Sequence, residues 1–203
     1  SDVLSVFAGL RPLAAPRSEG KKTKEISRSH KLIREKSGLI TIIGGKWTTY
    51  RKMAQDTLDL AIRYMHIPTK DCITERYQIH GSRKNPDFSD PLYVYGTDAD
   101  EIRNLVASSP AMAEKLHPDY AYTVGEVTWL VRNEMPRTLE DVLARRLRIL
   151  FLDARAAMAM APKVAGILAT EWGKDETWTS AQVKAFNAVS YTHLRAHETR
   201  HDL

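Results

Sequence analysis

Residues 38–51 place a short apolar strand, two glycines and the start of a helix directly after one another. Residues 39–43 are β-branched and almost continuously apolar, which is typical of a strand buried on both faces. Gly44 and Gly45 end this strand, and because they lack a Cβ they can adopt a positive φ and let a ligand approach the backbone. The pattern predicts a ligand-binding corner.

A helix over about residues 47–66 is expected to follow the glycines, with Thr48 or Thr49 as its cap. Its apolar positions recur four, three and four residues apart, which predicts one buried stripe of Ala54, Leu58, Ala61 and Met65. Free N–H groups at the start of the helix and the charge of Lys46 favour an anionic ligand. The alternative is a tight turn that needs glycine only for steric reasons, with Lys46 solvated.

The charge of the chain is concentrated around this corner. The net charge is +5, and residues 1–66 carry 13 Lys and Arg against 6 Asp and Glu, while the rest carries 17 against 19. Such a bias suits a small anion, a nucleic acid or an anionic membrane surface, and charge alone does not choose among them. No apolar run reaches the roughly 18 residues of a membrane-spanning helix. The single Cys72 excludes an internal disulfide, and we expect a buried structural thiol there.

Strands are also expected at residues 5–10, 26–33 and 73–79. Arg11 follows the first strand and is either part of a site or a solvated rim residue. In the second strand Arg28 and His30 share one face, because strand side chains alternate. That face either looks into the same cavity as Lys46 or is the polar side of an edge strand.

The second half of the chain has a helical pattern throughout, and we place a domain boundary near residue 92. Helices are expected over residues 98–107, 110–116, from the capping box Thr123–Glu126 to Pro136, from Thr138 onward, 153–171 and 178–189. Pro162 is expected to restart a helix as a first-turn residue, and Gly173 to close it.

The last residues contain His197-Glu198-Thr199-Arg200-His201, the spacing of zinc proteases. The chain offers no third ligand after this motif and no apolar face within residues 190–203 that would make a packed helix, so we discard a metal site. Residues 190–199 resemble translated non-coding or adaptor sequence, and we expect residues 190–203 to be a non-native tail.

Three motifs in this order carry a family resemblance. Phe7-Ala8-Gly9-Leu10-Arg11-Pro12-Leu13, Ser27-Arg28-Ser29-His30 and residues 38–51 together resemble FAD-dependent glycerol-3-phosphate dehydrogenase. Residues 136–146 resemble the C-terminal domain of that family, and the resemblance covers about residues 3–189. No G-x-G-x-x-G dinucleotide-binding motif occurs in the chain.

The resemblance implies an α+β fragment: the last strands and the flavin-facing helix of a Rossmann-like FAD-binding domain of the glutathione-reductase or amino-acid-oxidase type (residues 1–91), followed by an all-helical C-terminal domain (residues 92–189). It implies oxidation of sn-glycerol 3-phosphate to dihydroxyacetone phosphate, with FAD as hydride acceptor and a membrane quinone as electron acceptor. The fragment alone is expected to be inactive. The location implied is cytoplasmic, or peripheral on the cytoplasmic face of the inner membrane, where an anionic surface is a further candidate partner.

The resemblance also assigns site residues. Arg11 would be catalytic, beside the substrate hydroxyl and the flavin, and Arg11, Arg28 and Lys46 would bind the substrate and its phosphate. The cofactor-binding residues would be Gly44, Gly45, Lys46, Trp47, Thr48 and Thr49. The catalytic histidine of the family would belong to a part that precedes this chain, and we do not assign its role to His30.

Two alternatives remain at this point. The chain could be a basic helical module that binds nucleic acid, although it has no recognised DNA-binding motif and no basic stripe interleaved with aromatics. It could also be a flavin oxidoreductase acting on an amino acid or another polyol phosphate. The expected set Arg11, Arg28 and Lys46 argues for a substrate that carries a phosphate. We expect no nucleic acid as a partner.

Overall fold

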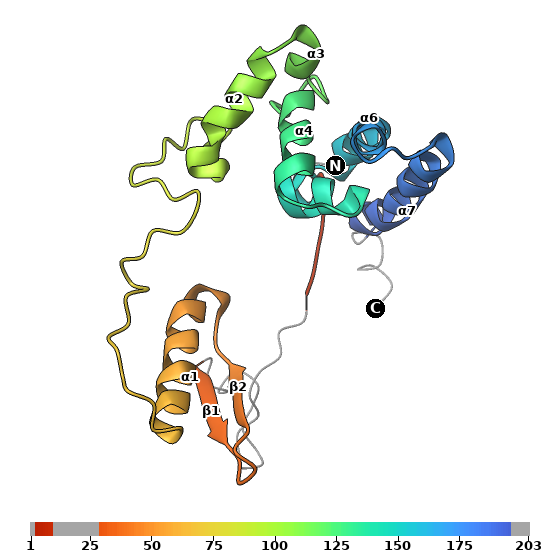
Figure 1. Cartoon of the computed structure of the whole chain (residues 1–203). Helices are drawn as coiled ribbons and strands as arrows, with labels where there is room; N and C mark the ends of the chain where they lie inside the picture. The colour runs from red at the N-terminus through yellow and green to blue at the C-terminus, as the bar shows by residue number, and fades with distance from the viewer. Residues whose placement is uncertain (1–2, 10–28, 196–203) are drawn as a thin grey trace. The chain divides into compact units, whose positions relative to one another are not determined.

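A computed structural model describes residues 3–9 and 29–195, which form two compact units (Figure 1). The hairpin unit comprises residues 9–79, and the helical unit comprises residues 1–8 and 80–203. The division therefore follows residue 79, ahead of the boundary expected near residue 92, and the first residues of the chain group with the helices.

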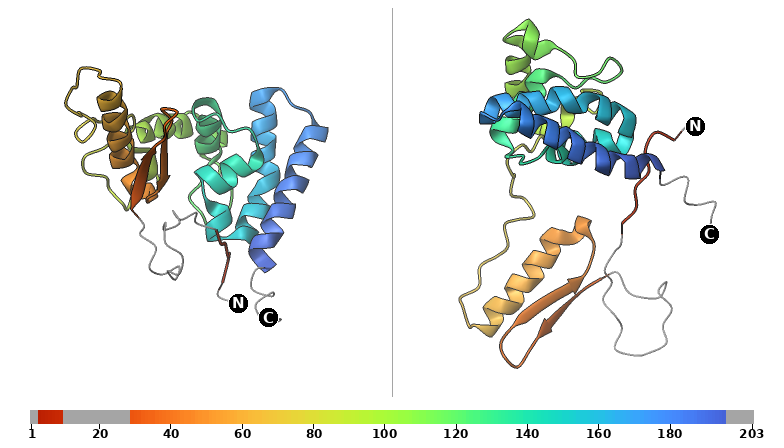
Figure 2. Two further views of the ribbon diagram at one scale, coloured as in Figure 1. Left: turned by 90° about the horizontal axis from the view of Figure 1, so that it is seen from below. Right: turned by 90° about the vertical axis from the view of Figure 1, so that its right-hand side faces the viewer.

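The hairpin unit is a two-stranded antiparallel sheet with one helix. Strand β1 (His30–Arg34) pairs with β2 (Ile40–Gly44), in a register that sets Leu32 opposite Ile42. A 3₁₀ turn, η2 (Trp47–Thr49), leads into helix α1 (Tyr50–Tyr64), which lies along the hairpin in the views of Figures 1 and 2.

Helix α1 turns a different face to the hairpin than the sequence predicts. Met53 lies against Gly45, Asp56 bonds to His30 and Tyr64 lies under the guanidinium of Arg34 at 3.7 Å. The predicted stripe is instead largely open, with Leu58 and Met65 61% and 57% exposed. The prediction is wrong because hairpin contacts of mixed polarity, rather than the apolar stripe, orient the helix.

Two of the expected strands are absent from the described residues. Residues 3–9 are an extended segment held by the helical unit, where the amide of Ala154 donates to the carbonyl of Leu4 (3.2 Å) and the rings of Phe7 and Phe151 pack edge to face. Residues 73–79 form no strand, and Ile73 and Tyr77 are exposed. Cys72 is also exposed, so the expectation of a buried thiol is wrong.

The helical unit consists of short segments around two long helices. In chain order they are η3 (Tyr93–Asp98), α2 (Ala99–Ala107), α3 (Pro110–Ala113), α4 (Val124–Asn133), the π-helical turn η4 (Asp141–Arg146), α5 (Ile149–Leu152), α6 (Ala154–Trp172) and α7 (Glu176–Arg195). Helices α6 and α7 lie side by side in Figure 2. Apolar side chains from α2, α4 to α6 and α7 form one buried core.

Local capping explains where several helices begin and end. Thr123 Oγ1 accepts from the amide of Glu126 at 3.2 Å, as the capping box predicts, and Asp153 Oδ1 accepts from the amide of Ala156 at 3.0 Å. Gly173 ends α6 in a left-handed conformation (φ 61°). Pro162 lies inside α6, so its expected role as a first-turn residue is wrong; burial of α6 in the core offsets the local loss of a hydrogen bond.

Helix α7 continues into the segment expected to be a tail. Ser190 is fully buried, and its Oγ donates to the carbonyl of Phe186 at 2.9 Å. The amide of Val6 donates to the carbonyl of His193 at 3.1 Å. The expectation of no packed helix is therefore wrong for residues 190–195, while His197 and His201 lie outside the described residues.

Candidate functional site

The glycine corner has the backbone geometry that the sequence predicts. Gly44 and Gly45 have φ values of 76° and 82°, which L-residues rarely adopt. A Cβ on Gly45 would lie 2.6 Å from Met53 Sδ and 3.3 Å from His30 Cβ. The positive φ therefore favours glycine at position 45, and a Cβ there would also force the Met53 side chain to move.

Thr49 occupies the expected cap position without the expected side-chain hydrogen bond to the helix. Thr49 is the N-cap of α1, yet its Oγ1 donates to the carbonyl of Lys46 at 2.9 Å and accepts no bond from the helix. This hydroxyl closes the turn backward, and the amides of Trp47 and Thr48 have no hydrogen-bond partner among the described residues. Two N–H donors therefore remain available directly after the glycines.

An exposed cation and an exposed indole border these donors. The side chain of Lys46 is exposed and has no ion-pair partner in the part of the chain that the structure describes. The side chain of Trp47 is 86% exposed and stacks on Tyr50 with ring centroids 5.8 Å apart. The corner thus presents a positive charge, free amides and a flat apolar surface, a combination that fits a planar anionic group.

A polar cluster next to the corner joins β1 to α1. His30 Nε2 lies 3.0 Å from Asp56 Oδ2, and Lys52 Nζ lies 2.8 Å from Asp56 Oδ1. The hydrogen bond from Lys52, helped by that from His30, lowers the pKa of Asp56. Sequence reasoning missed Asp56, although its place one turn after Lys52 on the same helix is the signal that could have found it.

Two of the predicted substrate-binding residues, Arg11 and Arg28, lie outside the described residues. Gly44, Gly45, Lys46, Trp47, Thr48 and Thr49 lie together at the corner. Whether the two arginines converge on Lys46 therefore stays a prediction.

The helical unit holds a buried polar pair that sequence reasoning did not identify as a pair. Tyr95 donates its phenolic proton to Glu126 Oε1 at 2.6 Å, and Glu126 is 4% exposed. Burial raises the pKa of Glu126, opposed by the bonds from Tyr95 and from the backbone, and burial also raises the pKa of Tyr95. No sequence signal links the two residues, because η3 and α4 meet only in the fold.

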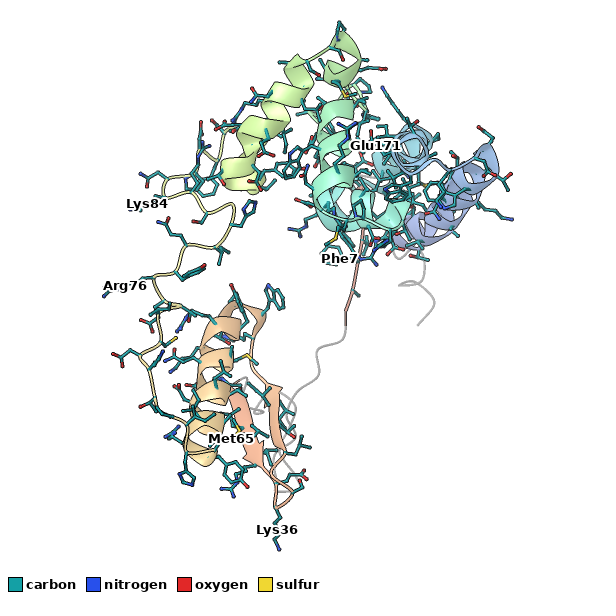
Figure 3. The ribbon with its side chains drawn as sticks, viewed as in Figure 1. Phe7, Lys36, Met65, Arg76, Lys84 and Glu171 are labelled. Carbon is teal, nitrogen blue, oxygen red and sulfur yellow. The ribbon has the colours of Figure 1, made fainter. Side chains whose placement is uncertain are left out.

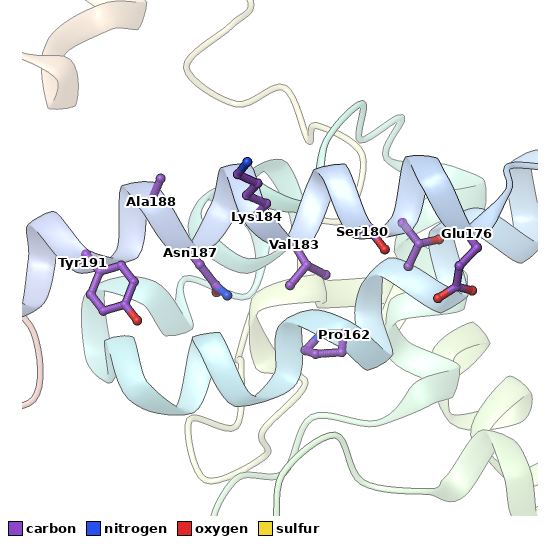
Figure 4. Close-up of a pocket in the computed structure, with 9 residues that line it drawn as sticks. Pro162, Glu176, Ser180, Val183, Lys184, Asn187, Ala188 and Tyr191 are labelled. Carbon is purple, nitrogen blue, oxygen red and sulfur yellow. The ribbon is translucent and has the colours of Figure 1, made fainter.

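A cavity of about 650 Å³ runs between α6 and α7 (Figure 4). Pro162, Val183, Asn187 and Tyr191 line it, and Asn187 Oδ1 is buried without a hydrogen-bond partner in the described part of the chain. Within residues 3–9 and 29–195, no group of three His, Cys, Asp or Glu side chains could hold a metal ion. None of the helices described is both long and apolar enough to cross a membrane.

Comparison with known proteins shows which family the chain belongs to. The family model of the C-terminal domain of alpha-glycerophosphate oxidase matches residues 39–179, across the domain boundary expected near residue 92. The chain is 37% identical to a probable mitochondrial glycerol-3-phosphate dehydrogenase of Dictyostelium discoideum, with 83% of the chain aligned to 30% of that protein. It is 34% identical to the mitochondrial glycerol-3-phosphate dehydrogenase SDP6 of Arabidopsis thaliana, with 86% aligned to 33%. A probable mitochondrial glycerol-3-phosphate dehydrogenase of Caenorhabditis elegans is 35% identical, with 91% aligned to 28%.

The chain spans about a third of the length of these relatives and corresponds to their C-terminal part. These matches confirm the resemblance drawn from the three motifs. The chain belongs to the family of the C-terminal domain of alpha-glycerophosphate oxidase, whose members include the C-terminal parts of glycerol-3-phosphate dehydrogenases.

Proposed function

We propose that the chain is the C-terminal part of an FAD-dependent dehydrogenase that oxidises sn-glycerol 3-phosphate to dihydroxyacetone phosphate. The observation that carries the proposal is the glycine corner, with its free amides and Lys46, in a chain whose relatives are named glycerol-3-phosphate dehydrogenase. The chain by itself is proposed to be inactive, because its relatives are about three times as long.

The corner fits the edge of a flavin. Gly44 and Gly45 leave the backbone of the corner without side chains, the amides of Trp47 and Thr48 have no partner among the described residues, and the start of α1 favours negative charge. Bound FAD would accept the hydride from the substrate carbon, and the donors at the corner would stabilise the negative charge of its reduced ring. The hydroxyl proton would leave to a base outside this chain.

Lys46 and the arginines supply the charge that a phosphate dianion requires. Lys46 would hold the phosphate together with Arg28, and Arg11 would lie beside the reacting hydroxyl. The electrons would pass from the flavin to a membrane quinone, with the enzyme bound peripherally at the membrane surface.

The proposal is tested in the protein completed from its upstream gene sequence. We expect a flavin absorbance band at about 450 nm. A completed protein that contains no flavin would overturn the assignment of FAD as its cofactor. Replacing Lys46 with alanine is expected to raise the KM for glycerol 3-phosphate strongly, since a hydrogen bond to a charged group contributes about 1.5–3 kcal/mol. Lys36→Ala is the matched control, because Lys36 projects from the hairpin turn away from the glycines (Figure 3). Equal KM values for both variants would remove Lys46 from the phosphate site.

A further inference from the structure

A second pocket lies wholly within the helical unit, where the end of α4 meets the turn between α6 and α7. It has a volume of about 570 Å³, in the range of small-molecule sites. Its lining consists of Val131, Met135, Pro136, Arg137, Trp172, Lys174 and Trp178, which we call the Trp pocket. The lining contains two cations and no carboxylate.

The two cations of the Trp pocket are not neutralised by neighbouring acids. Arg137 and Lys174 are exposed, and neither side chain has a hydrogen bond or ion pair within the described residues. Three acids near them in sequence pair with other cations: Glu171 with Arg132 through two bonds of 2.7 Å, Glu134 with Arg146 at 3.3 Å, and Asp141 with Arg145 at 3.0 Å. Asp175 and Glu176, which follow Lys174 in the chain, are exposed and do not line the pocket. The lining itself carries two positive charges and no negative one, which an anion can match.

The apolar wall is formed by two indoles. The rings of Trp172 and Trp178 meet edge to face, with centroids 5.7 Å apart and an interplanar angle of 78°. Their N–H groups have no partner among the residues the structure describes, unlike that of Trp129, which donates to Glu101 at 3.0 Å. Two half-buried rings with free donors offer a corner for a flat or aliphatic group and two hydrogen bonds for its polar end.

Met135 borders the pocket in an unusual conformation. Its φ is 46°, in the left-handed region that residues with a side chain rarely adopt, and its side chain is 75% exposed. A flexible, polarisable thioether held open beside two indoles can fold over an apolar group that enters the pocket.

We infer that the Trp pocket binds an anionic amphiphile, whose phosphate or carboxylate lies between Arg137 and Lys174 and whose apolar body lies against Trp172 and Trp178. A cationic ligand is disfavoured because the lining has no acid to balance it. The site is separate from the glycine corner and does not depend on the proposed dehydrogenase activity. The same chemistry is offered by a dissolved organic phosphate and by the headgroup region of an anionic lipid.

The test uses the whole chain and the indole N–H signals of its ¹⁵N NMR spectrum, since the four tryptophans give separately assignable probes. Titration with 1-naphthyl phosphate is expected to shift the signals of Trp172 and Trp178 and to leave that of Trp129 unmoved. Shifts of Trp47 alone would place binding at the glycine corner and overturn the proposal. 1-Naphthol and inorganic phosphate are each expected to bind about fivefold or more weakly than 1-naphthyl phosphate; equal binding of either would overturn the paired requirement for charge and apolar body.

Charge variants separate this site from general attraction to a basic protein. Arg137→Gln and Lys174→Gln are expected to weaken binding about fivefold each, as the loss of a partly exposed charged contact predicts. Arg155→Gln is the matched control, because Arg155 is exposed, has no ion pair among the described residues and lies near the other end of α6, roughly 25 Å from Trp172 at 1.5 Å per residue. An equal loss in Arg155→Gln, or unchanged binding in the Arg137→Gln/Lys174→Gln double variant, would overturn the inference.

A vesicle arm identifies the source of the anion. Binding to phosphatidylglycerol vesicles but not to phosphatidylcholine vesicles, lost in the double variant, would assign the pocket to a lipid headgroup. Naphthyl phosphate binding that is lost in the double variant, without vesicle binding, would assign it to a dissolved amphiphile.

Discussion

The hairpin unit and the helical unit differ in what holds them together. In the helical unit, Leu130, Leu143 and Leu168 have no exposed surface, and they belong to one continuous core. In the hairpin unit, none of the described residues 29–79 is fully buried, and every residue of β2 is only half buried. One unit is stabilised by a core of its own, and the other is a sheet fragment with a helix on it.

The difference has a physical cause in size and layering. The two strands and one long helix described in the hairpin unit cannot bury enough apolar surface to be stable alone, whereas the eight helical segments described in the helical unit, α6 among them, can. The open apolar side chains of the hairpin unit include Leu39, Trp47, Leu58 and Met65. Under the proposed function, the upstream part of the longer protein would cover them and complete the sheet.

The largest expected effect tests the core directly. Leu143→Ala should lower the free energy of unfolding of the helical unit by about 2–5 kcal/mol, because it leaves a cavity at a fully buried site. Leu58→Ala, at a residue on α1 that is 61% exposed, should change the free energy of unfolding by less than about 0.5 kcal/mol. Urea unfolding followed by circular dichroism measures both. Similar losses in the two variants would show that the units share one core.

The second effect concerns the glycine corner. Gly45→Ala should destabilise the hairpin unit by about 1–3 kcal/mol, since φ is 82° and the new Cβ would clash with Met53. Gly166→Ala, in α6 with open space around it, should instead stabilise the helical unit by up to about 1 kcal/mol. Hydrogen exchange of the paired residues Lys31 and Ile43 reports on the hairpin. Unchanged exchange in Gly45→Ala would show that the corner tolerates a side chain.

The helical unit was largely predictable from the sequence because its signals are local. The capping box at Thr123, the stop at Gly173 and the helical pattern of residues 153–171 each act within a few residues. Pro162 was misplaced because core packing on α6 outweighs a local helix breaker. The end of α7 was missed because Ser190 and His193 are fixed by contacts far away in the sequence, with Val6 among them.

The site was predictable only in part. Two adjacent glycines and Lys46 predicted the glycine corner, and its backbone has the expected positive φ values. Asp56 behind the corner was missed, and so was the pairing of Tyr95 with Glu126, because polar pairs between separate elements leave no periodic pattern. The face of α1 was misjudged for the same reason.

The third effect is a pH dependence confined to the helical unit. Burial raises the pKa of Glu126 in the folded state, so its contribution to stability is complete below the pKa of the unfolded chain and is lost as the pH rises through the folded pKa. Glu126→Gln keeps an acceptor for Tyr95 and removes the charge, so it should gain about 1 kcal/mol relative to wild type between pH 4 and pH 8. Urea unfolding at both pH values measures the difference. A constant difference would mean that Glu126 titrates as an exposed carboxyl.

The smallest effect compares one ion pair in each unit. Arg132 holds Glu171 through two bonds of 2.7 Å, while Arg51 reaches Glu75 at 3.3 Å and Thr74 at 3.1 Å. Both pairs are solvated, so Arg132→Gln and Arg51→Gln should each lower the free energy of unfolding by about 0–1 kcal/mol.

The local consequences of these two variants should nevertheless differ. In the helical unit the core keeps α4 and α6 together without the pair, whereas in the hairpin unit Arg51 is the side chain that ties the exposed residues 72–75 to α1. Arg51→Gln should therefore speed hydrogen exchange of residues 72–76, and Arg132→Gln should leave exchange in α4 and α6 unchanged. Faster exchange throughout α4 in Arg132→Gln would mean that surface pairs, and not the core alone, hold the helical unit together.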